Sequence, residues 1–228
     1  MNPYALLGLG LALGIRHATD PDHVVAVMAI SARTRRWLPA AGLGAIWGLG
    51  HTLTLFGVGT MIIMFNLTVP PRIGLALELA VALALIVVGA LNLGHRHGAT
   101  TGRAADDLRA AGERADAPLP AGRAFGVGLV HGLAGSAAVA LLVLSLVHDP
   151  LGACGYLAVF GLGTLIGMVL VTTGFAAPFA LVARRWPNFE TGARLATGLL
   201  SIGFGLWLVW QVGVVDGLFA AAPHWTPH

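Results

Sequence analysis

Six long apolar stretches, separated by shorter polar segments, make up most of this chain. They run near residues 4–32, 38–65, 73–94, 124–147, 151–182 and 191–215. Each has at least the roughly 20 residues that a helix needs to cross the ~30 Å hydrocarbon core of a bilayer. Because lipid cannot satisfy backbone hydrogen bonds, a spanning segment must make them internally, which favours helices. The pattern predicts an all-α polytopic membrane protein with six transmembrane helices.

The composition excludes a soluble globular domain. Hydrophobic residues make up 57% of the 228 positions and charged residues only 10%, whereas soluble domains carry about 25% charged residues. The start, MNPYALLGLG, lacks the positive segment of a signal peptide, so we expect the first apolar stretch to be retained. The single cysteine, Cys154, excludes an internal disulfide and a multi-thiolate metal site.

The basic residues predict the orientation. All 13 are arginines; Arg16 lies within the first apolar stretch, and alternating spans place Arg72 on one side of the membrane. The opposite side receives eleven, namely Arg33, Arg35, Arg36, Arg96, Arg103, Arg109, Arg114, Arg123, Arg184, Arg185 and Arg194. Cytoplasmic loops carry the excess of basic residues, so both termini are expected outside the cytoplasm. The arginines thus set topology, and no nucleic-acid partner is expected.

The two halves of the chain resemble each other. Gly14-Ile15-Arg16-His17-Ala18 aligns with Gly128-Leu129-Val130-His131-Gly132 at an offset of 114, and Trp47-Gly48-Leu49-Gly50 aligns with Phe160-Gly161-Leu162-Gly163 at 113. Three spans in each half would make the second half inverted, a recurring design of secondary transporters. The expected organisation is a first three-helix repeat (1–94), a cytoplasmic loop (95–122), a second repeat (123–215) and an extracytoplasmic tail (216–228). Chance similarity between Gly/Leu-rich stretches is the alternative.

Four ionisable residues interrupt the first apolar stretch, within GIRHATDPDHVVAV: His17, Asp20, Asp22 and His23. Such groups are costly at membrane depth and usually mark an ion path. Imidazoles and carboxylates together suit a borderline divalent cation such as Ni²⁺, Co²⁺ or Zn²⁺. On a continuous helix, however, His17 and His23 would lie about 120° apart and about 9 Å along the axis, too far to share one ion readily.

Pro21 resolves this difficulty by breaking the helix. It disfavours helical angles at Asp20 and suits the first position of a new helix, so the first span is predicted to be discontinuous. Asp20 would be the N-cap, or would pair with Arg16, which makes it the weaker ligand candidate and a capping or supporting residue. Carbonyls freed at the break are expected to face the site as further oxygen ligands. A polar kink whose residues satisfy each other is the alternative.

Three residues elsewhere join the candidate site. His51, in GLGHTLTL, lies inside the second span, where a packing role is equally plausible. His131, in GLVHGLAGS, aligns with His17. Glu78, about two turns into the third span, would either reach toward the interface or orient a ligand histidine.

These motifs resemble those of a known family. RHATDPDH is similar to the signature of the nickel/cobalt transporter (NiCoT) family, GLGHTLTL to its second motif, and GLVHGLAGSAAVALLVL to its shorter, urease-accessory UreH-like branch. The resemblance implies uptake of Ni²⁺ or Co²⁺, as substrate rather than cofactor, across a prokaryotic cytoplasmic (inner) membrane. It also implies that His17, Asp22 and His23 are essential metal-site residues, with His51 and His131 contributing. Efflux relatives with His-rich loops leave the direction open.

Two other classes of protein compete with a secondary carrier. One is the metal-binding membrane subunit of an ATP-driven transporter, which would need partners because the chain has no P-loop signature. The other is an intramembrane metalloenzyme, disfavoured because no HExxH occurs. We expect a non-enzyme whose partners are the cation and the bilayer; the sequence leaves a homo-oligomer open.

Overall fold

The computed structural model describes residues 3–32, 37–94, 121–147, 149–185 and 189–225, and these residues fold into helices with no strand among them. The predicted all-α class is confirmed. Along the chain the helices are α1 (Pro3–His17), α2 (Pro21–Ser31), α3 (Trp37–Met64), α4 (Pro71–Gly94), α6 (Ala121–Leu146), α7 (Pro150–Arg185) and α8 (Phe189–Trp210), which continues into a π-helical turn, η1 (Gln211–Val215).

These helices follow the predicted apolar stretches closely. The first stretch corresponds to two helices, α1 and α2, as the break at Pro21 predicts. Among the described residues, four helices are long and apolar enough to cross a membrane, namely α3, α4, α7 and α8; α1 and α2 are shorter apolar helices. Some side chains of α6 lie outside the described part of the chain. The predicted loop 95–122 lies outside the described residues, except that α6 already begins at Ala121.

Proline and aspartate define where several helices begin. Pro21, Pro71 and Pro150 are the first residues of α2, α4 and α7, a position that suits proline because its missing N–H would have no partner there. Before α7, the Asp149 carboxylate accepts a hydrogen bond from the Gly152 amide at 2.7 Å, so it caps the helix.

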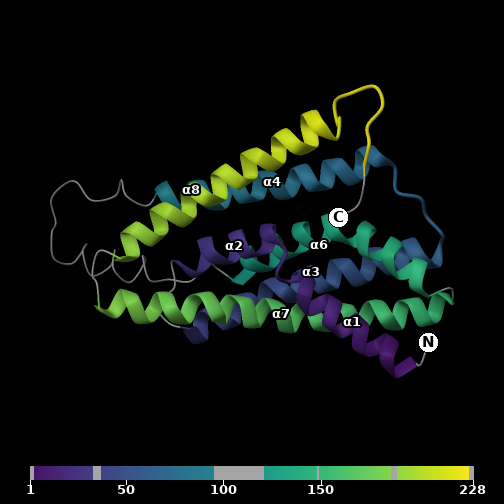
Figure 1. The fold of residues 1–228 in the computed structure, drawn as a ribbon, viewed down its shortest axis with the longest axis horizontal. Helices are drawn as coiled ribbons and strands as arrows, with labels where there is room; N and C mark the ends of the chain where they lie inside the picture. Colours follow the sequence, from purple (N-terminus) through teal and green to yellow (C-terminus); the bar gives the residue numbers. More distant parts are fainter. Residues whose placement is uncertain (1–2, 33–36, 95–120, 148, 186–188, 226–228) are drawn as a thin grey trace.

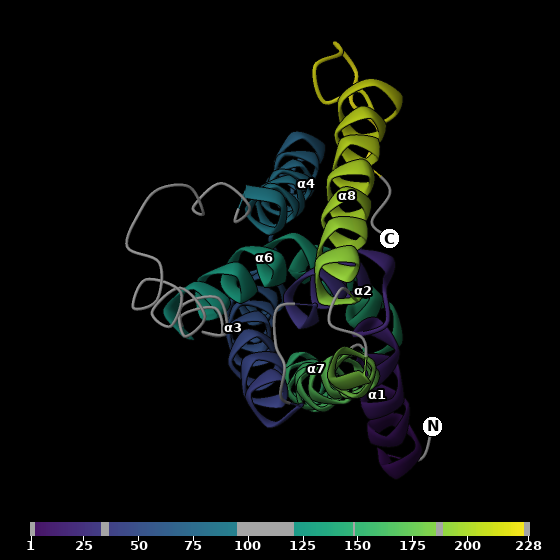
Figure 2. The same ribbon diagram turned by 90° about the vertical axis from the view of Figure 1, so that its left-hand side faces the viewer.

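The helices lie side by side as an elongated bundle (Figure 1). The start of α1, the end of α3, the start of α4 and the end of α6 lie at one end, here called the N-terminal end, and the ends of α2, α4 and α7 lie at the opposite end. Helix α3 packs against α6 and α7, and α7 also packs against α1. Helices α4 and α8 pack against each other beside this group (Figure 2).

Glycines bring these helices into backbone contact. A Cβ added at Gly14 of α1 would overlap the Phe160 carbonyl of α7, and one at Gly128 of α6 would overlap the Trp47 carbonyl of α3. Small residues at helix interfaces let backbones approach closely in membranes, where packing contacts replace the hydrophobic effect as the main attraction between helices. The resulting close contacts hold α1, α3, α6 and α7 around the middle of the bundle.

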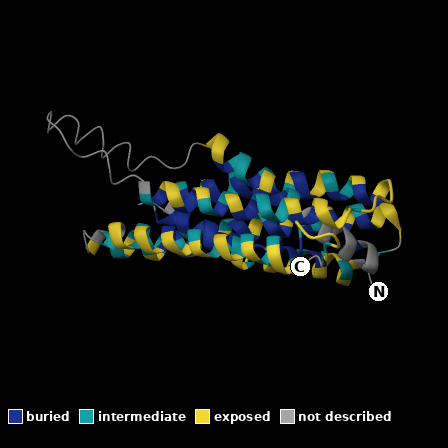
Figure 3. Ribbon diagram, turned by 90° about the horizontal axis from the view of Figure 1, so that it is seen from above, coloured by how far each residue is buried: buried dark blue, intermediate teal, exposed yellow. Residues whose placement is uncertain are grey.

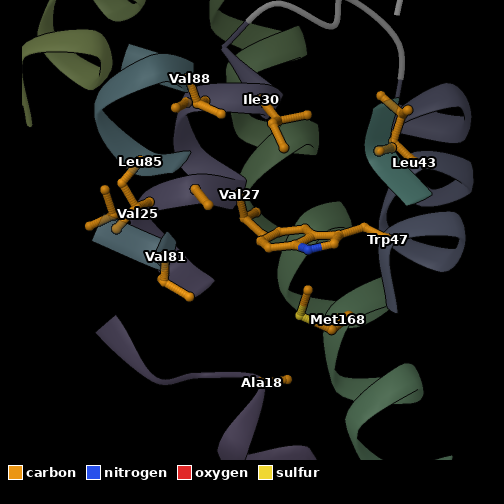
Figure 4. Close-up of a cluster of buried hydrophobic side chains, with 13 residues drawn as sticks. Ala18, Val25, Val27, Ile30, Leu43, Trp47, Val81, Leu85, Val88 and Met168 are labelled. Atoms are coloured by element: carbon orange, nitrogen blue, oxygen red, sulfur yellow. The ribbon is translucent and has the colours of Figure 1, made fainter. Parts of the chain in front are cut away.

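Two apolar cores fill the bundle. The first apolar core contains Ala18, Val25, Ala26, Val27, Ala29, Ile30, Leu43, Trp47, Val81, Leu85, Val88, Ala124 and Met168, and in Figure 4 the Trp47 indole extends toward Val27 at its centre. The second apolar core contains Leu55, Ile62, Ile63, Val139, Val143, Ala153, Tyr156, Leu157 and Phe160. The first core draws on the end of α2 and the start of α3, whereas the second draws on the end of α3 and the start of α7. They therefore extend toward opposite ends of the bundle.

The outer surface is largely apolar, as a lipid environment requires. Exposed positions alternate with buried ones along each helix, and the buried ones face the interior (Figure 3). Leu53, Leu170 and Leu199 are more than half exposed, although soluble proteins rarely leave such side chains uncovered over a large contiguous surface. This surface and the four long apolar helices identify a membrane protein.

The C-terminal tail folds back onto α4. The Trp225 indole lies against Gly74, where an added Cβ would overlap the ring, and its Nε1 donates a hydrogen bond to Glu78 Oε1 at 2.8 Å. Arg72 donates a hydrogen bond to the Ala220 carbonyl at 3.4 Å. Trp225 also packs against the second apolar core, so residues 216–225 cover part of the N-terminal end.

Candidate metal centre

The break in the first span ends α1 at the histidine that the motif analysis singled out. Asp20 occupies the N-cap position of α2, with φ −60° and ψ 146°, as predicted, but its side chain makes no capping hydrogen bond. Instead, its Oδ2 lies 2.7 Å from His17 Nδ1. The sequence therefore places Asp20 correctly but assigns its carboxylate the wrong partner.

Two carbonyls at the end of α1 are already hydrogen-bonded. The Arg16 carbonyl accepts from the Thr19 amide at 2.8 Å and from the Thr19 hydroxyl at 2.6 Å. The His17 carbonyl accepts from the Asp20 amide at 3.1 Å. The turn therefore uses both acceptor positions of the Arg16 carbonyl and one of the two on the His17 carbonyl, and the expectation that freed carbonyls supply further ligands stays a prediction.

Four histidine rings from four helices meet beside this break. The ring centroid of His23 lies 4.9 Å from that of His17, 5.0 Å from that of His51 and 4.4 Å from that of His131. The centroids of His17 and His51 are 5.3 Å apart. His23, His51 and His131 are buried, so the structure brings all four predicted histidines together in the interior of the bundle.

Asp22 holds two of these rings. Its Oδ1 lies 3.0 Å from His23 Nδ1, and its Oδ2 lies 2.8 Å from His131 Nε2. An ionised carboxylate only accepts hydrogen bonds, so both histidines donate N–H to it. This fixes the neutral tautomer of His23 with its lone pair on Nε2. A carboxylate that orients a histidine in this way commonly lies behind a metal ligand.

Imidazole nitrogens suited to a metal converge on one point. His17 Nε2, His23 Nε2 and both ring nitrogens of His51 are buried and have no hydrogen-bond partner among the described residues. One ligand atom from each of these three residues can be chosen so that all lie within 4.8 Å of one another. Burying an unpaired polar group costs about 1–3 kcal/mol, and a cation bound to the three nitrogens would remove that cost.

A second set of ligands overlaps the first. Asp22, His23 and His131 also offer one ligand atom each within 4.8 Å of one another. His23 belongs to both sets, so it lies at the centre of the arrangement. Asp20 is further out, with a side chain that is 45% exposed, and supports His17.

Glu78 lies in a different environment from the histidines. Its Oε1 accepts the hydrogen bond from Trp225 described above, and neither set of ligands among the described residues includes it. The sequence correctly placed Glu78 on α4. It could not predict the hydrogen bond between Glu78 and Trp225, because the two residues are 147 positions apart.

Two aromatic residues that the site prediction did not include contact the histidines. The Trp47 ring centroid lies 6.0 Å from that of His23 and 5.7 Å from that of His131. The Phe160 centroid lies 5.6 Å from that of His17. Trp47 and Phe160 begin the aligned WGLG and FGLG segments, and that alignment is the sequence feature that could have included them in the predicted site.

Comparison with known proteins gives one relative over nearly the whole chain. Urease accessory protein UreH from Bacillus sp. (strain TB-90) is 33% identical over 220 residues, covering 94% of this chain and 95% of that protein. Two Arabidopsis thaliana proteins, chloroplast protein FOR GROWTH AND FERTILITY 1 and 2, are 25% and 26% identical over 88% of this chain, which spans 57% and 55% of their lengths. No family model matches the chain. No solved structure matches it either.

Proposed function

The chain belongs to the family of urease accessory protein UreH, and we propose that it is a secondary transporter that carries Ni²⁺ or Co²⁺ across the cytoplasmic membrane. The observation that carries this proposal is the cluster of His17, His23 and His51, which offer one ligand atom each within 4.8 Å of one another and carry buried ring nitrogens without a hydrogen-bond partner among the described residues. Neutral imidazoles suit nickel and cobalt, and the single cysteine excludes a thiolate-rich site. The resemblance of the motifs to the NiCoT family points to the same cations.

In the proposed site, the three histidines bind the cation and the two carboxylates orient them. Asp20 supports His17, and Asp22 supports His23 and His131. Metal–nitrogen bonds of about 2.0–2.1 Å place the ligand atoms of a tetrahedral site about 3.3 Å apart. In the structure the ligand atoms of the three histidines lie within 4.8 Å of one another. Small ring rotations would close that difference. The C-terminal end of α1, with its partial negative charge, favours a cation at the same point.

Transport would proceed by alternating access between two inverted repeats. The packing supports this, because Gly14 meets the Phe160 carbonyl just as Gly128 meets the Trp47 carbonyl, and each residue of one pair aligns with its counterpart in the other. Gly163 against Leu11 and Gly50 against Phe125 repeat the relation. Discontinuous helices at a repeat interface are typical of secondary transporters. A cation released by one rocking motion could leave on the opposite side.

The arginine distribution and the membrane potential favour uptake. Eleven arginines belong to segments predicted on the cytoplasmic side, which supports an orientation with the N-terminal end of the bundle outside. A potential that is negative inside favours entry of a divalent cation by about 4.6 kcal/mol per 100 mV, twice the value for one charge. This driving force would suffice for accumulation by roughly a thousandfold.

The test is uptake of radioactive nickel into proteoliposomes that contain only this protein, driven by a potassium diffusion potential. We expect uptake by the wild type, loss of uptake in His17→Ala, and normal uptake in His224→Ala, which changes an exposed histidine of the tail. Co²⁺ and Zn²⁺ as competitors would rank the cations.

Two outcomes would overturn the proposal. Wild-type rates in His17→Ala would exclude the histidine cluster as the path. Binding of nickel without uptake would instead favour the second candidate, a metal-binding subunit of an ATP-driven transporter.

A further inference from the structure

Trp47 and Phe160 flank the histidine cluster at different points. Trp47 contacts the rings of His23 and His131, and its ring is nearly parallel to that of His23, with an angle of 22°. Phe160 contacts His17. Both aromatic residues are buried, with 2% and 3% of their surface exposed.

The two aromatic residues belong to different apolar cores. Trp47 is part of the first apolar core, together with Leu43 and Ile30 (Figure 4), and the end of α2 and the start of α3 carry this core toward the opposite end of the bundle. Phe160 is part of the second, which extends toward the N-terminal end through Leu157 and Ile62. Since a divalent cation is far more stable in water than in such an apolar environment, the packing beside the histidines must open on both sides for it to pass, and each aromatic ring belongs to one core and contacts the histidines.

Their backbones occupy matching environments. The Trp47 carbonyl lies against Gly128 and the Phe160 carbonyl against Gly14, and both pairs follow the repeat offset of 113–114 residues. Residues related in this way would exchange environments when inverted repeats exchange conformations.

Trp47 carries a further sign of a second conformation. Its indole Nε1 is buried and has no hydrogen-bond partner among the described residues. An unpaired buried N–H is destabilising by about 1–3 kcal/mol. A conformation in which the ring turns into a hydrated opening would satisfy that group, so the closed position has a specific cost that opening would relieve.

We propose that Trp47 and Phe160 are a pair of repeat-related gates, with Phe160 closing the metal site toward the outside and Trp47 closing it toward the cytoplasm. The inference rests on the alternating access of the proposed function. In the present structure both rings are in place, and the unpartnered ring nitrogens of His17, His23 and His51 are buried among the described residues. Opening moves one ring at a time away from the histidines, together with the apolar core behind it.

The test measures access to the site without requiring transport. Cys154→Ser removes the only cysteine, and Gly135→Cys adds one whose Cβ would lie 3.6 Å from His17 Nε2, an ordinary contact distance. A membrane-impermeant thiol reagent is applied with a chelator to spheroplasts, which expose the outside, and to inverted vesicles, which expose the cytoplasmic side. Phe160→Ala should raise the labelling rate about tenfold from the outside only. Trp47→Ala should raise it about tenfold from the cytoplasmic side only. Each tenfold change corresponds to a loss of about 1.4 kcal/mol in the free energy that keeps the gate closed.

Matched controls separate a gate from general loosening. Tyr156 and Leu43 lie one turn before Phe160 and Trp47, are buried in the same cores, and are themselves related by the repeat offset. Tyr156→Ala and Leu43→Ala should change labelling much less than the gate variants and without preference for one side, and Trp47→Phe, which keeps a ring but removes the unpaired N–H, should not raise it. Size-exclusion chromatography of each variant checks folding, and where an alanine variant is not monodisperse, Phe160→Leu or Trp47→Leu replaces it.

Labelling from the same side in both gate variants, or from neither side in either, would overturn the inference. Equal effects of the control and gate substitutions would do the same. If side-specific labelling is found but the wild type transports no nickel, the gates stand and the proposed cargo is wrong. The two proposals can therefore fail separately.

Discussion

Replacing Asp22 by asparagine should weaken nickel binding more than the same replacement at Asp20. The Asp22 carboxylate accepts from His23 at 3.0 Å and from His131 at 2.8 Å, whereas the Asp20 carboxylate holds only His17. Asparagine has one acceptor oxygen, so Asp22→Asn leaves one of the two rings facing an NH₂ group. That ring must turn or change tautomer.

The structure sets the expected size of each effect. Losing a carboxylate behind a ligand histidine typically weakens metal affinity by about 10–100-fold. Asp22 holds two rings and its side chain is 29% exposed, so we expect about 100-fold, or about 2.8 kcal/mol. Asp20 holds one ring and is 45% exposed, so solvent screens it more and about tenfold or less is expected.

The assay is equilibrium binding of nickel to the purified protein by isothermal titration calorimetry. Asp149→Asn is the matched control, because Asp149 caps α7 away from the histidines and asparagine caps helices equally well; its affinity should equal that of the wild type. The reasoning would be refuted if Asp20→Asn weakened binding as much as Asp22→Asn, or if neither weakened it.

Three further predictions concern packing, the tail and pH. Gly14→Ala should destabilise the protein by about 1–3 kcal/mol because a Cβ there meets α7 backbone. Gly8→Ala, with open space around it inside the same helix, should keep or slightly raise the melting temperature, and equal melting temperatures of the two variants would contradict the packing argument. In a double-mutant cycle, Glu78→Ala and Trp225→Phe should show a coupling of about 1 kcal/mol from their hydrogen bond, and additive effects would exclude it. Nickel affinity should fall in acid, because imidazoles must be neutral to bind a metal, and calorimetry showing no fall at any acid pH at which the protein stays folded would argue against histidine ligands.

The helices and the break could be predicted because both depend on local sequence. Apolar length determines which segments can cross a bilayer, and Pro21 both excludes the preceding residue from helical angles and begins the next helix. The inclusion of His131 in the same histidine cluster as His17 was also suggested, by their alignment in the two halves. These features need no knowledge of which helices become neighbours.

Partner choice over long distances could not be predicted. Asp20 had three groups within reach, an amide, Arg16 and His17, and its selection of His17 depends on how the turn folds. The contact between Glu78 and Trp225 depends on the tail returning to α4. The contacts of Trp47 and Phe160 with the histidines require the packing of α3 and α7, although the repeat had already paired these two residues.

The most direct test of the metal centre is X-ray absorption spectroscopy at the nickel edge on the metal-loaded protein. The account predicts a shell of nitrogen and oxygen at about 2.0–2.1 Å, with the outer scattering of three imidazole rings and no sulfur. His51→Ala should remove one ring from that pattern. A shell without imidazole scattering, or a spectrum unchanged in His51→Ala, would contradict the assignment of the histidine cluster as the metal site.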